Sequence, residues 1–223
     1  MVALLIFLFF FTQLYAAEFG FLTGSEVDTE GQSYSYVGLM GGKEIRSTTL
    51  ILGKLWADYL VYKFDHSGKE VKAEAPAFQL SAGVKKRYET WSVTFWAGWE
   101  RRDTKVSPDL PGVKVKGVDN SLVAQFELFN RYENGFSSEF MLSYTSATSY
   151  LWSRGRVKKA LFGSKTYLGV ELIGQGNADY RAVQSGLLAG LSLGELSTAF
   201  RVGYRNSSKG DGAYAGLEVY IGF

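Results

Sequence analysis

Several residue types are absent or scarce in this sequence of 223 residues, which has no cysteine, 3 prolines and 1 histidine. Without cysteine the chain forms neither disulfides nor thiolate metal sites, and we expect no metal site and no cofactor. The formal net charge is only +2 and no run of like charges occurs, so nothing indicates a nucleic-acid partner. Beyond the N-terminal region, the best candidate for a transmembrane helix is Leu50 to Tyr62. It is short and is interrupted by Lys54 and Asp58.

The N-terminal region carries an apolar run, because residues 1–11 are apolar without exception and the run ends in Ala16 and Ala17. A short apolar run followed by small residues predicts a secretory signal peptide over residues 1–17, although no Lys or Arg precedes it. Cleavage after Ala16 or Ala17 would leave a single domain over residues 18–223. The alternative is a membrane anchor that stays attached.

The most abundant signal is an alternation of apolar and polar residues in segments of about ten residues, such as Trp91 to Glu100. Segments of this length match tilted strands that cross a bilayer, whereas strands of globular proteins are nearer five or six residues. The 16 Phe, 14 Tyr, 5 Trp and 26 Gly suit a barrel with aromatic girdles and many turns. We therefore predict an all-β fold, an antiparallel transmembrane β-barrel of twelve strands, with ten or fourteen as alternatives. The expected strands are 18–27, 33–42, 48–64, 77–86, 91–102, 121–130, 136–146, 150–161, 166–175, 181–193, 196–206 and 212–223.

The connections between these segments alternate in length, and the two longest are 65–76 and 103–120. Short periplasmic turns and longer outer loops are typical of bacterial barrels, and an even strand count returns both termini to the periplasm. All three prolines, Pro76, Pro108 and Pro111, fall in or at the edge of the long connections. We expect this placement because proline cannot donate a hydrogen bond to a strand ladder.

The last segment alternates up to the terminal residue, since every second residue backwards from Phe223 is apolar as far as Ala213. A terminal aromatic residue on an alternating last strand resembles the signal that outer-membrane assembly machinery reads. The alternative is a soluble sheet whose last strand ends the chain. In the barrel, an outward position is expected for Phe95, Phe200, Val202, Ile221 and Phe223.

If the apolar residues face lipid, the other residues of each strand face the lumen, and this set is rich in charge. Turn positions predict that Arg156 lies opposite Glu171 and that Arg201 lies opposite Glu218. Glu127 and Glu139 would meet across the turn at 131–135, which is unfavourable unless a cation such as Arg156 lies within reach. Such groups form either a salt-bridged plug or a charged channel, and we favour an occluded lumen. The expected inward charges are Lys54, Asp58, Glu100, Glu127, Glu139, Arg154, Arg156, Glu171, Arg201, Arg205 and Glu218.

Large inward side chains must share a limited interior, because twelve strands enclose far less space than the sixteen of a porin. Trp96 and Trp152 are the largest of these side chains. Inward glycines would partly offset their volume. The glycines expected to do so are Gly83, Gly98, Gly169, Gly186 and Gly203.

The single histidine lies in the connection Asp65-His66-Ser67-Gly68. Adjacent strand residues point to opposite faces, so His66 and Ser67 are not placed as a serine–histidine pair on a strand. We therefore expect no catalytic residues. The alternative is a barrel enzyme that modifies lipids.

Six stretches resemble the bacterial cellulose biosynthesis protein BcsS family, and they occur in the same order through nearly the whole mature chain. They are Tyr36-Val37-Gly38-Leu39, the loop from Asp103 to Pro111, Ser143 to Ala147, Leu151 to Val157, Gly176 to Arg181, and Asp211 to Leu217.

This resemblance implies an outer-membrane protein that supports the biosynthesis or export of cellulose or another exopolysaccharide without being an enzyme. Its partners would be outer-membrane lipid and, beyond it, a polysaccharide and other cellulose-secretion components. A structural or adhesive barrel is a further alternative. The candidates for lining the lumen or contacting a glycan are Trp152, Arg154, Arg156, Glu171, Arg201, Glu218 and Tyr180.

Overall fold

The computed structural model describes residues 17–113, 115–161, 165–177, 180–208 and 210–223. Apart from Ala17, the predicted signal peptide therefore lies outside the described residues. Among these residues, none forms a helix long and apolar enough to span a membrane.

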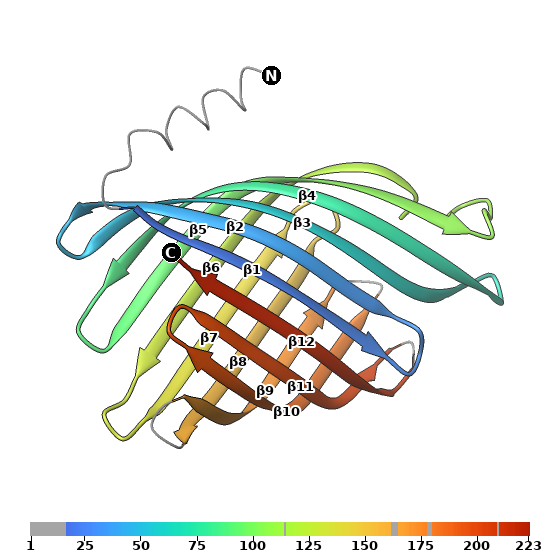
Figure 1. The fold of residues 1–223 in the computed structure, drawn as a ribbon. Helices are drawn as coiled ribbons and strands as arrows, with labels where there is room; N and C mark the ends of the chain where they lie inside the picture. Colours follow the sequence, from blue (N-terminus) through green and yellow to red (C-terminus); the bar gives the residue numbers. More distant parts are fainter. Residues whose placement is uncertain (1–16, 114, 162–164, 178–179, 209) are drawn as a thin grey trace.

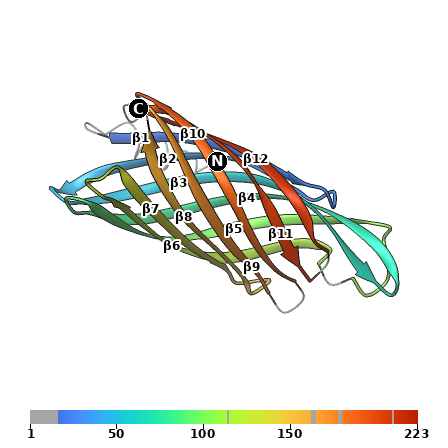
Figure 2. The same cartoon turned by 90° about the horizontal axis from the view of Figure 1, so that it is seen from below.

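Within the described chain, twelve antiparallel strands form a closed barrel, which confirms the predicted fold. Each strand pairs with its neighbours in sequence, and the pair Gly20↔Gly222 joins the last strand to the first. The strands run obliquely around the barrel axis (Figures 1 and 2). Their bounds are β1 Ala17–Asp28, β2 Ser33–Arg46, β3 Thr49–His66, β4 Lys69–Arg87, β5 Trp91–Ser107, β6 Gly117–Arg131, β7 Phe136–Thr145, β8 Tyr150–Leu161, β9 Thr166–Gly176, β10 Arg181–Leu193, β11 Leu196–Ser207 and β12 Gly212–Gly222.

The alternation of residues gives the barrel wall two chemically distinct faces. Phe95, Phe200, Val202 and Phe223 are exposed on the outside, as predicted, and Ile221 is half-buried on the same side of β12. Arg201, the neighbour of Phe200 and Val202, is buried inside. An apolar exterior with charges enclosed is the pattern that a lipid environment requires.

Two expectations about the long connections were wrong. The segment 65–76 is not a loop, because Ser67 and Gly68 make a tight turn with positive φ and β4 begins at Lys69. Much of 103–120 likewise belongs to β5 and β6. Both segments are rich in charged residues, and each contains Gly and Pro, which is why they resembled loops.

Pro76 lies inside β4 and not in a connection, so its predicted exclusion from the sheet was also wrong. The ladder between β4 and β5 pairs Glu74 with Lys105 and Ala77 with Arg102 but leaves Ala75 and Pro76 unpaired. Arg102 Nη1 donates instead to the carbonyl oxygen of Ala75 at 2.9 Å. The sheet therefore accommodates a residue without an N–H by interrupting one ladder and satisfying the free carbonyl with a side chain.

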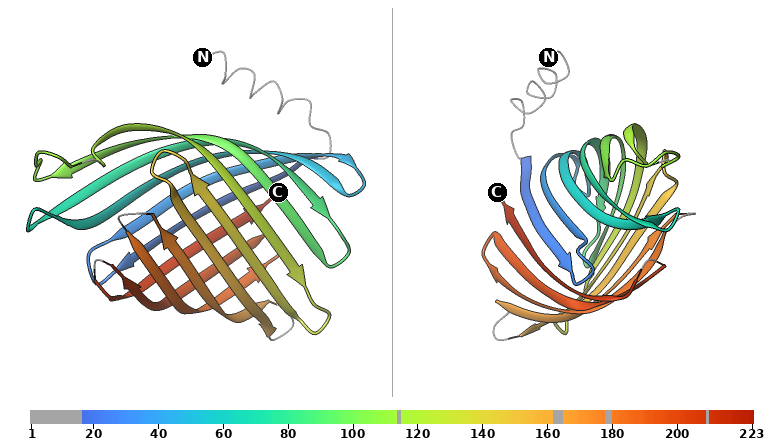
Figure 3. Two further views of the ribbon diagram at one scale, coloured as in Figure 1. Left: turned by 180° about the vertical axis from the view of Figure 1, so that it is seen from behind. Right: turned by 90° about the vertical axis from the view of Figure 1, so that its right-hand side faces the viewer.

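The wall is much taller on one side than on the other. Strands β3, β4 and β5 have 18, 19 and 17 residues, whereas β7 has 10 and β9 has 11. The extra length extends past the rim at the end opposite the termini (Figure 3). We call residues 59–76 and 101–107 the outer arm.

The outer arm reverses the pattern of the barrel wall. Its inward positions in β4, Val71, Ala73 and Ala75, are apolar and fully buried at 0% exposure. Its outward positions include the exposed Lys72 and Lys105. Charged residues outside and apolar residues inside are what water requires, so the outer arm stands clear of the lipid.

Candidate functional site in the barrel lumen

A network of ion pairs fills the lumen on the side of β8 to β12. Arg156 and Glu171 are directly opposite each other on β8 and β9, as predicted. Arg156 Nε lies 2.8 Å from Glu171 Oε2, and Arg156 Nη1 lies 2.9 Å from Glu218 Oε1. The side chains of Arg156 and Glu171 are only 1% and 0% exposed, so this pair is shielded from water.

The predicted pairing of Arg201 with Glu218 was wrong, because Arg201 faces Gly216 and Glu218 faces Ala199. The register of β11 and β12 is shifted by two residues from the expected one. Arg201 instead lies 3.2 Å from Glu171 Oε1 and 3.3 Å from Glu26 Oε2. Glu218 forms ion pairs with both Arg154 and Arg156, and Arg154 Nη1 lies 3.3 Å from Glu218 Oε2.

The expected meeting of Glu127 and Glu139 does not occur, since Glu127 faces Met141 and Glu139 faces Phe129. Glu139 forms an ion pair with Lys158 and lies 4.0 Å from Arg156 Nη1, the cation expected within its reach. Each carboxylate in this region therefore has its own partners. Glu127 Oε1 accepts hydrogen bonds from Trp96 Nε1 at 3.0 Å and from Gln125 Nε2 at 2.5 Å.

Three members of the network were missed by the sequence reasoning. Glu26 contributes from β1 a carboxylate that pairs with Arg201. Tyr36 donates a hydrogen bond to Glu218 Oε2 at 2.8 Å, and Tyr214 donates one to Glu171 Oε1 at 3.1 Å. Their inward parity is visible in the sequence, but closure of the barrel selects their partners.

Large inward rings lie flat against glycines of neighbouring strands. A Cβ atom at Gly38 would lie 2.4 Å from Trp56 Cε3, and one at Gly83 would lie 2.6 Å from Trp96 Cε3. Tyr214 covers Gly186 and Gly203 in the same way, whereas Gly98 and Gly169 face Ser81 and Leu188. The rings therefore line the wall, and the centre of the lumen is left to the charged side chains.

A second charged cluster lies nearer the outer arm. Arg102 Nη2 lies 2.9 Å from Asp58 Oδ1, and Arg102 Nε lies 3.2 Å from Glu100 Oε1. Deeper in the barrel, Lys54 Nζ donates to Gln125 Oε1 at 2.9 Å and lies 4.9 Å from the centre of the Trp96 ring.

The predicted candidate residues divide into one cluster and two outlying members. Arg154, Arg156, Glu171, Arg201 and Glu218 form the connected network described above. Trp152 adjoins it, since the Arg154 guanidinium lies 5.5 Å from the Trp152 ring. Tyr180 stands apart at the outer mouth, where its backbone N–H donates to Asn177 Oδ1 at 3.0 Å.

His66 lies at the end of β3, where its Nε2 is 3.0 Å from the carbonyl oxygen of Pro111. This contact joins the tip of the β3–β4 hairpin to the loop after β5. Among the described residues, no group of three or more His, Cys, Asp or Glu is placed to hold a metal ion.

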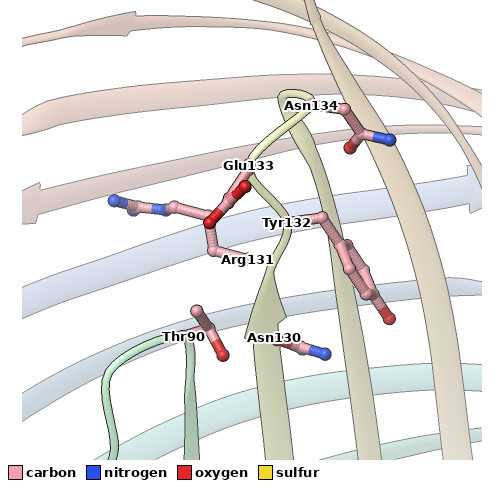
Figure 4. A pocket seen from close by; sticks show the side chains of 6 residues that line it. All are labelled: Thr90, Asn130, Arg131, Tyr132, Glu133 and Asn134. Carbon is pink, nitrogen blue, oxygen red and sulfur yellow. The ribbon is translucent and has the colours of Figure 1, made fainter.

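Two cavities lie near the end of the barrel where the termini are. One of about 490 Å³ is lined by Thr90 and residues 130–134 (Figure 4). Another of about 200 Å³ is lined by residues that include Lys85, Glu127 and Glu139. The second cavity shares Glu139 with the network around Arg156, whereas the first shares no residue with it.

A closed twelve-stranded barrel with an apolar exterior and an ion-paired interior defines the class of outer-membrane β-barrel proteins. The chain belongs to the family described as "Cellulose biosynthesis protein BcsS", whose model matches residues 21–223. It is therefore a barrel of the bacterial outer membrane that is associated with cellulose biosynthesis. No curated protein sequence matches the chain significantly.

Solved structures support the same fold at low sequence identity. The COG4313 outer membrane channel from Pseudomonas putida F1 has a TM-score of 0.63 and 9% identity, covering 93% of this chain and 95% of that one. The KdgM porin has a TM-score of 0.52 and 9% identity, covering 92% and 99%. The translocator domain of autotransporter NalP from Neisseria meningitidis has a TM-score of 0.54 and 12% identity, covering 92% and 87%. At these identities the likeness concerns the fold alone.

Proposed function

We propose that this protein is a non-enzymatic component of the outer membrane that supports the biosynthesis or export of cellulose, and that its lumen is occluded at rest. Family membership supports the link to cellulose. The observation that carries the proposal is the mutual neutralisation of charges in the lumen. Because these groups are engaged with one another, the interior is suited to a plug more than to a reaction centre or a selective ion path.

The balance of charge supports the plug. Among the described residues, the network joins four cations, Arg154, Arg156, Lys158 and Arg201, to four carboxylates. A pore selective for one sign of ion presents an excess of the opposite charge along its wall. This network presents no such excess. The four carboxylates are Glu26, Glu139, Glu171 and Glu218.

Single-channel recording in planar bilayers tests the plug directly. We expect the purified protein to show no stable large conductance. The double variant Arg156→Ala/Glu171→Ala removes two large side chains without changing the net charge, so it should raise the conductance. The matched control Lys63→Ala/Glu70→Ala removes an ion pair of the outer arm and should leave the conductance unchanged. A large stable conductance from the unaltered protein would refute the plug and favour a passive channel.

Deletion of the gene in the bacterium that carries it tests the cellular role. We expect the amount of secreted cellulose to fall and to return when the intact gene is supplied. If cellulose output stays unchanged, a structural or adhesive barrel becomes the better interpretation. Co-purification of other cellulose-secretion components with the intact protein would support their role as partners.

The rival activity, modification of membrane lipid, depends on His66. The contact of His66 Nε2 with the Pro111 carbonyl favours a structural role, because a catalytic histidine needs a nucleophile or a reacting atom within reach. Mass spectrometry of outer-membrane lipids from cells with the intact protein and the His66→Ala variant decides between them. We expect identical lipid profiles. A modification that is present with the intact protein and lost in the variant would establish the enzyme.

A further inference from the structure

Four tyrosines surround the outer mouth of the barrel, above the ion-pair network. Tyr34 lies at the start of β2, Tyr62 in the part of β3 that belongs to the outer arm, Tyr150 at the first position of β8, and Tyr180 immediately before β10. All four residues are half-buried, so each keeps part of its surface exposed. We call them the tyrosine mouth.

The four tyrosines come from two sides of the mouth. On one side, Tyr34 of β2 pairs with Leu60 of β3, two residues before Tyr62. On the other side, the Tyr150 hydroxyl reaches Gln175 near the end of β9, the strand that precedes Tyr180. Arg102 interacts electrostatically with Tyr34, Tyr62 and Tyr150. Tyr150 also interacts with Tyr62 and Tyr180, although β3 and β8 are far apart in the strand order. The tyrosines therefore lie around the end of the lumen where Arg102 is.

The outer arm extends this aromatic surface beyond the rim. The rings of Tyr62 and Phe64 are 5.9 Å apart at an angle of 31°, and both residues lie on the inward side of β3. Because the outer arm stands in water, an accessible aromatic surface there has no lipid to contact. It is therefore available to a ligand that arrives at the mouth.

The polar groups of the tyrosine mouth are uncharged or already paired. Tyr150 Oη donates to Gln175 Oε1 at 3.0 Å, and Gln175 also forms a hydrogen bond with Tyr180. Arg102 is occupied by Asp58, Glu100 and the Ala75 carbonyl. Arg205, which interacts electrostatically with Tyr150 and Tyr180, is paired with Asp28. Among the described residues, the mouth thus offers aromatic faces, hydroxyls and an amide, and the two cations beside the tyrosines are neutralised by carboxylates.

A glucan with β-linkages presents flat rings with apolar C–H faces and hydroxyl groups at their edges. Aromatic faces combined with a few neutral hydrogen-bonding groups match that chemistry. We propose that the tyrosine mouth binds a neutral β-linked glucan chain at the outer surface of the barrel. This proposal rests on the proposed function and adds the place and chemistry of polymer contact.

Isothermal titration of the purified full-length barrel in detergent with cellohexaose tests the proposal. We expect saturable binding that is weakened about 3- to 10-fold by Tyr62→Ala and by Tyr150→Ala, since each removes one aromatic contact. Tyr62→Phe keeps the ring and should bind like the unaltered protein. Tyr59→Ala is the matched control, because Tyr59 lies three residues away on β3 and faces outward. Oligogalacturonate, an anionic probe, should not bind.

The shift of the folded barrel on unheated gels shows which variants have assembled, and only assembled variants are compared. No binding of cellohexaose by the unaltered protein overturns the tyrosine mouth. Equal binding by Tyr62→Ala, Tyr150→Ala and the control also overturns it, because the glucan would then bind elsewhere. Equal binding of oligogalacturonate overturns the preference for a neutral chain. The proposed function is tested separately by the amount of cellulose that the gene-deletion strain secretes, and none of these binding results changes that outcome.

Discussion

Apolar and polar residues alternate in both the barrel wall and the outer arm, but the apolar residues face outward in the wall and inward in the arm. In β11 of the wall, Phe200 and Val202 face outward and Arg201 faces inward. In β4 of the outer arm, Lys72 faces outward and Val71 faces inward. Both regions belong to the same antiparallel strands, so the difference lies in the surroundings. Lipid covers the outside of the wall, whereas water covers the outside of the arm.

The point where the outward residues change from apolar to charged marks where β3, β4 and β5 leave the membrane. On β4, the last outward apolar residue before the arm is Phe78, and on β5 it is Trp99. The next outward position on β5 is Arg101, which is exposed. Aromatic residues at the edge of the apolar band are typical of the girdle at a membrane interface.

The largest effect on the free energy of unfolding is expected on the inner face of the wall. There Glu171 accepts hydrogen bonds from Arg156, Arg201 and Tyr214. Glu171→Ala should destabilise the barrel by about 3–5 kcal/mol, because two buried guanidinium groups lose a carboxylate. Urea unfolding in detergent, followed by tryptophan fluorescence, measures the loss. The isosteric Glu171→Gln should lose less. A change below about 1 kcal/mol for Glu171→Ala would mean that the network does not hold the wall together.

A smaller effect is expected when charge is placed on the outside. Leu187 lies at the middle of β10 and is exposed to lipid. Leu187→Arg should cost about 2–4 kcal/mol in unfolding from lipid vesicles. In the outer arm, Tyr59→Arg should cost less than about 1 kcal/mol, because Glu74 lies within hydrogen-bonding distance of the Tyr59 hydroxyl. Equal costs at the two positions would contradict the placement of the arm in water.

The glycines of the wall provide an intermediate test. Gly38→Ala places a methyl group 2.4 Å from Trp56 Cε3 and should destabilise the barrel by about 1–3 kcal/mol as the ring is displaced. Gly155→Ala is the control, because its Cβ would meet no atom within 4 Å. Urea unfolding of both variants measures the difference. If Gly38→Ala is as stable as Gly155→Ala, the ring does not rest on the glycine.

The smallest effect is expected for an ion pair of the outer arm. Lys63 Nζ lies 3.1 Å from Glu70 Oε1, and the two side chains are 39% and 64% exposed. Glu70→Ala should change the free energy of unfolding by less than about 1 kcal/mol, and the change should shrink further in high salt. Urea titrations at low and high salt measure it. A loss as large as that of Glu171→Ala would remove the contrast between arm and wall.

The strands and their faces were predictable from the sequence because each strand carries its own information. Outward Phe95 and inward Arg201 follow from alternation alone. Arg156 opposite Glu171 was predicted because the register of β8 and β9 is centred on the connection 162–165, as expected. The pairing of Arg201 was not predictable, because moving the centre of a connection by one residue moves every partner by two.

The sequence by itself determined the strand count, the side of the wall for residues of the expected strands, and the apolar band that lipid requires. Tertiary structure alone decided the partners inside the lumen. Closure of the barrel brings Tyr36 to Glu218, 182 residues apart, and Glu26 to Arg201. It also decided that Pro76 lies within β4, because Arg102 from the neighbouring strand satisfies the carbonyl that the interrupted ladder leaves free. Alternation records which face a side chain takes, but contacts across a closed lumen depend on strand tilt and register around the whole barrel.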